Sequence, residues 1–91
     1  MDEIPRIRSV VPLDNTRLLV CFDNGVEKIY DCELLLQRPA FALLNTPAFF
    51  RAVKVDPGGY GVSWNDNLDI SEYELWCNGS PVAREQVDQT A

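Results

Sequence analysis

The chain is 91 residues long, 46% hydrophobic, and carries a formal net charge of −6 with no histidine. This length allows one domain with a single modest core. The acidic balance argues against a dominant phosphate-binding surface, because nucleic-acid affinity depends mostly on lysine and arginine. The lack of histidine removes the commonest general base and every histidine-dependent triad.

The chain shows no sign of a membrane or secretory segment. No apolar run approaches the roughly 18 residues of a membrane span, and the start, MDEIPRIR, lacks the apolar region of a signal peptide. We therefore expect a cytoplasmic protein with no membrane partner. Cys21, Cys32 and Cys77 are odd in number and share no C-x-x-C spacing, so we predict buried free thiols instead of disulfides or a zinc site.

Residues 4–13 predict a first strand. Alternation places Ile7, Val11 and Leu13 on one face, and Val10 falls on the other. The two prolines of this segment lack amide donors, which confines the strand to the edge of a sheet or limits its length.

The next two segments predict the rest of a three-stranded meander. Residues 17–22 are apolar without alternation, as is typical of a central strand covered on both faces. Asn24 and Gly25 predict a tight hairpin turn in which both central positions have positive φ. Residues 26–30 then alternate as the third strand.

Residues 31–49 change to short helical segments. A turn of helix is expected near residues 31–36, Pro39 interrupts it, and a second piece covers residues 40–44 before Asn45–Pro47 end it. The apolar side chains of this region are expected to cover one face of the meander: Leu34, Leu35, Phe41, Leu43, Leu44 and Phe49. They form core in the simplest interpretation and the wall of a small-ligand pocket in the alternative.

A second hairpin follows. Residues 50–55 predict a fourth strand, Asp56–Gly59 a turn whose glycines can take positive φ, residues 60–64 a fifth strand, and residues 68–70 a brief pairing. The sequence therefore predicts an α+β fold: a mostly antiparallel sheet of about five strands, the meander plus the second hairpin, with short helices over one face.

The last element is a helix of about two turns. Ser71 and Glu74 form an S-x-x-E capping box, in which each side chain bonds the other's backbone amide. Ile70 and Leu75 have the spacing of a hydrophobic staple, and Gly79 suits a left-handed residue after the last turn. We expect residues 1–79 to form the single domain and 80–91 a disordered polar tail.

The acidic cluster near this helix does not have the spacing of a metal loop. Asp66, Asp69 and Glu72 recur at every third residue, and Leu68 and Ile70 occupy positions where a calcium loop needs oxygen ligands. We predict no metal, cofactor or catalytic site. The carboxylates are assigned to the turn and the helix start, with some left over for a partner.

Several short motifs resemble a known family. They are I-P-R-I at Ile4, L-V-C-F-D-N-G at Leu19, G-V-S-W at Gly61, D-I-S at Asp69 and E-L-W-x-N-G at Glu74. Together they are similar to a bacterial family catalogued as a domain of unknown function, number 2442. The resemblance implies a small α+β domain with a meander and a terminal helix, and no established activity. It also implies that some members continue into a helix-turn-helix DNA-binding domain, and that the genes often lie beside a small partner in a toxin–antitoxin-like arrangement.

Two functions are compatible with these observations. We expect first a non-enzymatic cytoplasmic module, antitoxin-like in a two-gene pair, that binds a basic protein through its acid-rich end. The alternative is a sensory domain for a small ligand. Because the chain stops about a dozen residues past the last motif, we expect no direct nucleic-acid binding. The predicted partner-binding residues are Asp66, Asp69, Glu72, Tyr73 and Trp76.

Overall fold

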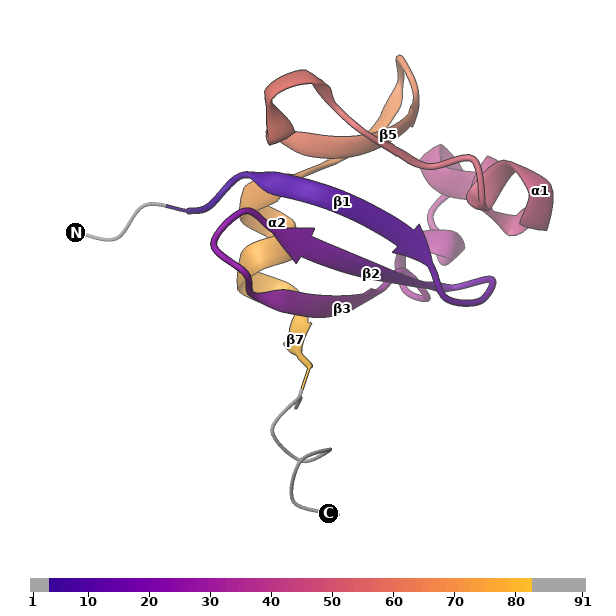
Figure 1. The fold of residues 1–91 in the computed structure, drawn as a ribbon. Coiled ribbons are helices and arrows are strands. Elements are labelled where there is room, and N and C mark those ends of the chain that lie inside the picture. The colour runs from indigo at the N-terminus through magenta and orange to yellow at the C-terminus, as the bar shows by residue number, and fades with distance from the viewer. Residues whose placement is uncertain (1–3, 83–91) are drawn as a thin grey trace.

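The computed structural model describes residues 4–82 and places two antiparallel sheets around short helices (Figure 1). The first sheet has the order β1-β2-β3-β7 and the second β4-β5-β6. The strands are β1 (Ile7–Pro12), β2 (Arg17–Phe22), β3 (Glu27–Asp31), β4 (Lys54–Val55), β5 (Gly61–Asn65), β6 (Leu68–Ser71) and β7 (Ser80–Pro81). The helices are η1 (Leu35–Gln37), η2 (Pro39–Asn45), α1 (Pro47–Phe50), η3 (Pro57–Gly59) and α2 (Glu72–Asn78), of which the η elements are 3-10 helices.

The predicted α+β class and the antiparallel pairing are confirmed. The described strands number seven and divide between two sheets, where the sequence predicts about five in one. Their shared core draws from both sheets and from α1 and α2, with Phe22, Phe50 and Leu75 fully buried. The indole of Trp64 is buried in this core and donates a hydrogen bond to the Phe50 carbonyl oxygen at 2.8 Å.

A β-bulge in β1 overturns part of the predicted face assignment. The pairing with β2 shifts just after Ile7, so that Arg8 is an extra residue in the strand. Such a shift moves every later side chain to the opposite face. Val10 therefore packs against the core, while Val11 is 48% exposed and Leu13 is exposed beside it.

The β2–β3 hairpin is confirmed, with a different turn from the one predicted. Gly25 has φ of 92°, and no residue other than glycine has positive φ between residues 4 and 82. The amide of Gly25 donates to the Phe22 oxygen at 3.0 Å, and that of Phe22 to the Val26 oxygen at 2.9 Å. These bonds define a three-residue loop whose last position is left-handed, so only the glycine needs that conformation.

The fourth strand is much shorter than predicted. Pairing in this segment is limited to Lys54–Val55, and Phe50 lies in α1. The reason is visible in the sequence: Pro47 occupies the first helical position, where its missing amide costs nothing and its fixed φ suits a helix. Asn45 and Thr46 end η2 as predicted, but Thr46 and Pro47 also begin α1, a helix that takes the place of the start of the predicted fourth strand.

The apolar residues of the middle segment only partly cover the sheet. Leu44 is buried, and Leu35, Phe41 and Phe49 pack against the core. The predicted burial of two other residues of this set is wrong, because Leu34 is 76% exposed and Leu43 is also exposed. Leu34 precedes η1 as its N-cap, and Leu43 lies in η2, where the 3-10 periodicity differs from that of the expected α-helix.

The cap of α2 is confirmed at its start and differs at its end. Ser71 Oγ accepts a hydrogen bond from the Glu74 amide at 3.2 Å. Gly79 is extended, with φ of −78°, so the predicted left-handed conformation is wrong. Glycine is required there by close approach, since an added Cβ would lie 2.6 Å from the Leu75 oxygen and 3.1 Å from the Lys28 Cβ.

The described chain continues in the sheet past the predicted domain end at residue 79. Ser80 and Pro81 form β7 opposite Ile29 and Lys28 of β3, and the Val82 amide donates to the Glu27 oxygen at 3.0 Å. Most of the segment 80–91, predicted to be a disordered tail, lies outside the described residues.

The three cysteines differ in accessibility. Cys21 and Cys32 are buried as predicted, whereas Cys77 is exposed on α2, which corrects the prediction for that thiol. Burial raises the pKa of the Cys32 thiol to about 12, and the neighbouring charge of Asp31 adds to the shift. A buried thiol of such high pKa forms little of the reactive thiolate.

Cysteine reactivity tests this arrangement. At pH 8, iodoacetamide is expected to alkylate Cys77 in the folded protein and to reach Cys21 and Cys32 only after unfolding. Mass spectrometry of digested protein identifies the modified site, and Cys77→Ser is the control that should leave the folded protein unmodified. Fast alkylation of Cys32 in the folded Cys77→Ser protein would contradict the described core.

Two glycines with positive φ form a matched pair for stability. Gly25→Ala meets no atom within 4 Å and is expected to cost only the left-handed backbone, about 1–2 kcal/mol. Gly59→Ala has the same backbone problem and places its Cβ 2.6 Å from the Ile7 oxygen, which adds about 1–3 kcal/mol of overpacking. Urea unfolding of both variants measures the difference, and equal losses would show that η3 does not press on β1.

Candidate functional site

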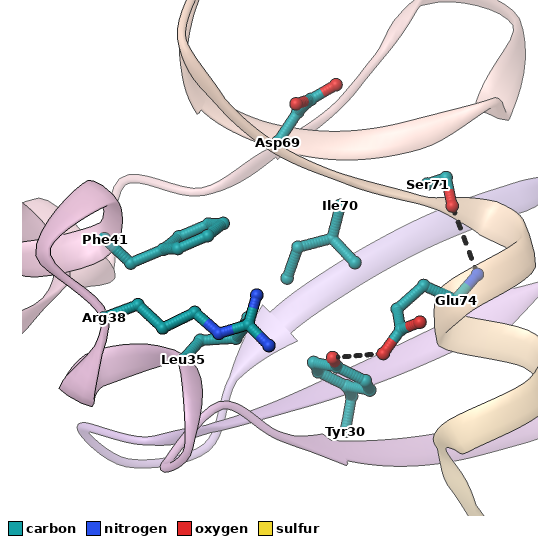
Figure 2. A pocket seen from close by; sticks show the side chains of 8 residues that line it. All are labelled: Tyr30, Leu35, Arg38, Phe41, Asp69, Ile70, Ser71 and Glu74. Carbon is teal, nitrogen blue, oxygen red and sulfur yellow. Dashed lines mark hydrogen bonds between the residues drawn. The ribbon is translucent and has the colours of Figure 1, made fainter.

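An open cleft of about 280 Å³ lies between the η1–η2 segment and the β6–α2 segment (Figure 2). One wall carries Leu35, Arg38 and Phe41. The opposite wall, made by β6 and the start of α2, carries Asp69, Ile70, Ser71 and Glu74. Tyr30, near the end of β3, lies between the two walls.

The alternation of β6 explains its contribution to the cleft. Leu68 and Ile70 are buried, while Asp69 and Ser71 are exposed, as expected for a strand with one face on the core. Ser71 is both the end of this strand and the N-cap of α2. Asp69 and Glu74 therefore lie on the same wall, one before the cap and one after it, with the Glu74 carboxylate directed into the cleft and the Asp69 carboxylate directed to the outer face of β6 (Figure 2).

A hydrogen bond between the phenol of Tyr30 and Glu74 defines the inner end of the cleft. Tyr30 Oη donates to Glu74 Oε2 at 2.8 Å (Figure 2). Burial, followed by the hydrogen bond to Glu74 and its charge, raises the pKa of Tyr30 above its usual range. The phenol consequently stays protonated and serves as a donor. In a full capping box the Glu74 carboxylate would accept a hydrogen bond from the Ser71 amide. Here the Glu74 carboxylate accepts from Tyr30 in place of that bond.

Arg38 supplies the positive charge of the cleft. It connects η1 to η2 in an extended conformation with ψ of 135°, and its side chain is directed across the cleft toward Tyr30 and Glu74 (Figure 2). Phe41 presents its ring from the same wall. The cleft thus combines the Arg38 guanidinium and the Glu74 carboxylate with apolar side chains from both walls, and the Asp69 carboxylate lies at its rim.

The predicted partner-binding residues do not all meet at this cleft. Asp69 lines it, and Asp66 is exposed in the turn between β5 and β6. Tyr73 is 62% exposed on α2. Glu72 is half-buried at the start of α2, where its amide donates to the Tyr60 oxygen at 2.9 Å.

Trp76 has a structural role. Its ring meets Phe22 edge to face with centroids 5.0 Å apart. The Lys28 ammonium lies 3.9 Å from the indole centroid and donates to the Trp76 carbonyl oxygen. The half-buried indole is therefore held between the first sheet and a lysine, with little surface left for a partner.

Sequence analysis missed Tyr30 and Arg38 as site residues. Tyr30 is an inward-facing residue of an alternating strand, and Arg38 precedes a proline in a segment of helical pieces. Neither pattern differs from that of an ordinary structural residue. Glu74 was the one residue of this contact that the sequence analysis singled out, as part of the capping box. Its bond to Tyr30 depends on how α2 packs against β3.

The fold and the cleft define a small α+β domain with an open cleft of mixed polarity. No three histidine, cysteine, aspartate or glutamate side chains gather as a metal site within residues 4–82. Along the same stretch, every helix is too short or too polar to cross a membrane.

The family model described as "Protein of unknown function (DUF2442)" matches residues 7–79, and the chain belongs to this family. No match is found among curated proteins or among solved structures.

The Tyr30–Glu74 bond can be tested with two tyrosines. Tyr30→Phe leaves a half-buried carboxylate without its donor and is expected to lower the free energy of unfolding by about 1–3 kcal/mol. Tyr73→Phe makes the same chemical change on an exposed side chain and should change it by less than about 0.5 kcal/mol. Denaturant unfolding monitored by circular dichroism measures both, and a neutral Tyr30→Phe would contradict a stabilising bond.

Proposed function

We propose that this protein is a non-enzymatic interaction module that binds a basic protein partner at the cleft. The observation that carries this proposal is the pair of acidic residues, Asp69 and Glu74, on one wall of an open cleft whose other wall carries the apolar Leu35 and Phe41 and a single guanidinium, that of Arg38. A partner's lysine or arginine side chain has the matching chemistry, with a cationic end for these carboxylates and an aliphatic stem that can pack on apolar surface.

The charge distribution around the cleft supports a basic partner. From β5 to the end of α2 the chain carries Asp66, Asp69, Glu72 and Glu74 and no lysine or arginine. Such one-sided charge attracts a partner of opposite sign and speeds association. Tyr73 adds an exposed aromatic side chain, a residue type enriched at protein interfaces.

The size of the cleft also supports insertion of partner side chains. Pockets for small molecules usually have volumes of about 300–1,000 Å³ and enclose most of the ligand. This cleft is open and measures about 280 Å³. It therefore suits one or two side chains of a larger partner, in the manner of an interface hot spot.

The family resemblance supports a more specific role. We propose that the chain is the antitoxin-like, cytoplasmic member of a two-gene pair, and that its partner is the small protein encoded beside it. The acidic side of the domain would complement a basic enzyme that acts on nucleic acid. No nucleic-acid contact by this domain itself is proposed.

A small-ligand sensor is the second candidate, and the cleft itself is the observation that favours it. Arg38, Tyr30 and Ser71 supply polar groups at its edges. A zwitterionic ligand with a carboxylate and an ammonium group would match Arg38 and Asp69. Amino acids raising the melting temperature of the isolated protein would support the sensor, and an unchanged melting temperature would count against it.

Charge reversal at the cleft tests the interaction directly. Asp69→Lys is expected to weaken binding of the co-expressed neighbouring gene product at least about tenfold, because one buried or rim charge pair becomes a repulsion. Asp23→Lys makes the same change in the exposed β2–β3 turn and should have little effect. Isothermal titration with the purified partner measures affinity, and raised salt should slow association with the unmodified protein.

Melting temperatures separate binding from folding in this experiment. Both aspartates are exposed, so each variant should unfold within a few degrees of the parent. Equal affinity of all three proteins, unaffected by salt, would show that the acidic wall is only a solvated surface and would contradict the proposed function.

A further inference from the structure

We infer that the free edge of β6 is a strand-addition site, at which an extended basic segment of the partner pairs with the backbone of Asp69 and Ser71. This inference rests on the proposed function and specifies how the partner binds. In this mode main-chain hydrogen bonds supply affinity and alternate side chains supply specificity.

The hydrogen-bond alternation of the second sheet shows which backbone groups are free. The Asp56 amide donates to the Gly61 oxygen at 2.8 Å, so Gly61 bonds toward β4. The Glu72 amide donates to the Tyr60 oxygen at 2.9 Å, so Tyr60, the residue just before Gly61, bonds toward the β6 side. Alternate residues of an antiparallel strand point their backbone groups to opposite sides. The amide and carbonyl of Ile70, which pairs with Val62, therefore point toward β5, while both backbone groups of Asp69 and the amide of Ser71 point away from it. The Ser71 carbonyl is at the N-cap, where it accepts the first bond of α2.

In the described part of the chain, the outward groups of Asp69 and the outward amide of Ser71 have no strand beside them. In the order β4-β5-β6, β6 is the last strand. Within residues 4–82, no backbone hydrogen bond outside the helices and strands ends on Asp69 or Ser71. Proteins usually protect such an edge with proline or lysine, as Pro12 and Pro81 do on β1 and β7. β6 has the sequence LDIS and carries neither residue.

The cleft lies along this edge and has room for the side chains of an added strand. Asp69, Ile70 and Ser71 all line it, and β6 runs along its rim in Figure 2. A strand placed about 4.8 Å from β6 alternates its side chains between two faces. One set would enter the cleft toward Leu35 and Phe41, and the other would lie beside the carboxylate of Asp69.

Charge complementarity selects the occupant. A residue directly opposite Asp69 is favoured when basic, whereas like charges opposite each other are destabilising. A second copy of β6 would bring two Asp69 carboxylates to the same edge, which disfavours self-pairing. The occupant is therefore an extended segment in which apolar residues alternate with lysine or arginine, offered by a basic partner.

Ser71 permits a substitution that blocks only the edge. Its φ of −73° lies within the range that proline imposes. The residue before it, Ile70, is in a strand, as a residue before proline prefers. Ser71→Pro thus replaces the outward amide with a ring that fills the place of the added strand. Ser71→Ala is the matched control, because both variants lose the N-cap oxygen but only the proline removes the amide.

The test is a titration of isotope-labelled protein with the peptide acetyl-Val-Arg-Val-Arg-Val-Arg-amide, followed by two-dimensional nuclear magnetic resonance up to millimolar peptide. We expect shifts along β6 and the cleft and slowed hydrogen exchange of the Asp69 and Ser71 amides. Ser71→Ala should bind like the parent, and Ser71→Pro at least about tenfold more weakly, a factor that corresponds to about 1.4 kcal/mol. The same peptide with glutamate in place of arginine should not bind.

Each contrary result has a distinct meaning. Equal binding by the proline and alanine variants, with the glutamate peptide inactive, would overturn strand addition and leave a side-chain interaction intact. No shift along β6 at millimolar arginine peptide would overturn the inference, while the Asp69→Lys titration with the natural partner decides the proposed function separately. Shifts along β6 that depend on protein concentration alone would assign the edge to a second copy. If Ser71→Pro does not fold, amide exchange in the parent protein still decides.

Discussion

The docking of α2 on the first sheet is the constraint on which the rest of the structure depends. A helix of two turns is too short to be stable in water, so its conformation must come from tertiary contacts. Leu75 is fully buried, and Trp76 meets the edge of Phe22. Gly79 allows the helix end to approach Lys28 closely enough for the chain to continue into β7. Loss of this docking would remove one wall of the core and one wall of the cleft together.

The same docking produces the candidate site. Because Ser71 ends β6 and caps α2, the position of the helix fixes where the outer edge of β6 lies. The Tyr30–Glu74 hydrogen bond then joins the helix to β3 at the inner end of the cleft. Glu74 therefore has a structural role within the candidate site, whereas the Asp69 side chain is exposed.

Local chemistry is sufficient to determine several elements of this protein from its sequence. The Asp23–Gly25 and Asp56–Gly59 turns need only residues that tolerate positive φ at defined places; both turns occur where predicted, although at the first only Gly25 has positive φ. The Ser71 cap requires only a hydroxyl and an amide three residues later. The meander and the α+β class follow from these turns and from apolar patterning, which acts within a few residues.

Other features depend on residues that are distant in the sequence. The bulge at Arg8 changes the exposed face of β1, and it is specified by pairing with β2 rather than by the strand's own pattern. The contact between Tyr30 and Glu74 spans 44 positions, and no local pattern encodes it. Sequence determined which side chains are acidic, apolar or able to cap. Only the tertiary structure decided which of them meet at the cleft and which backbone edge remains open, because both depend on how the two sheets and α2 are placed in space.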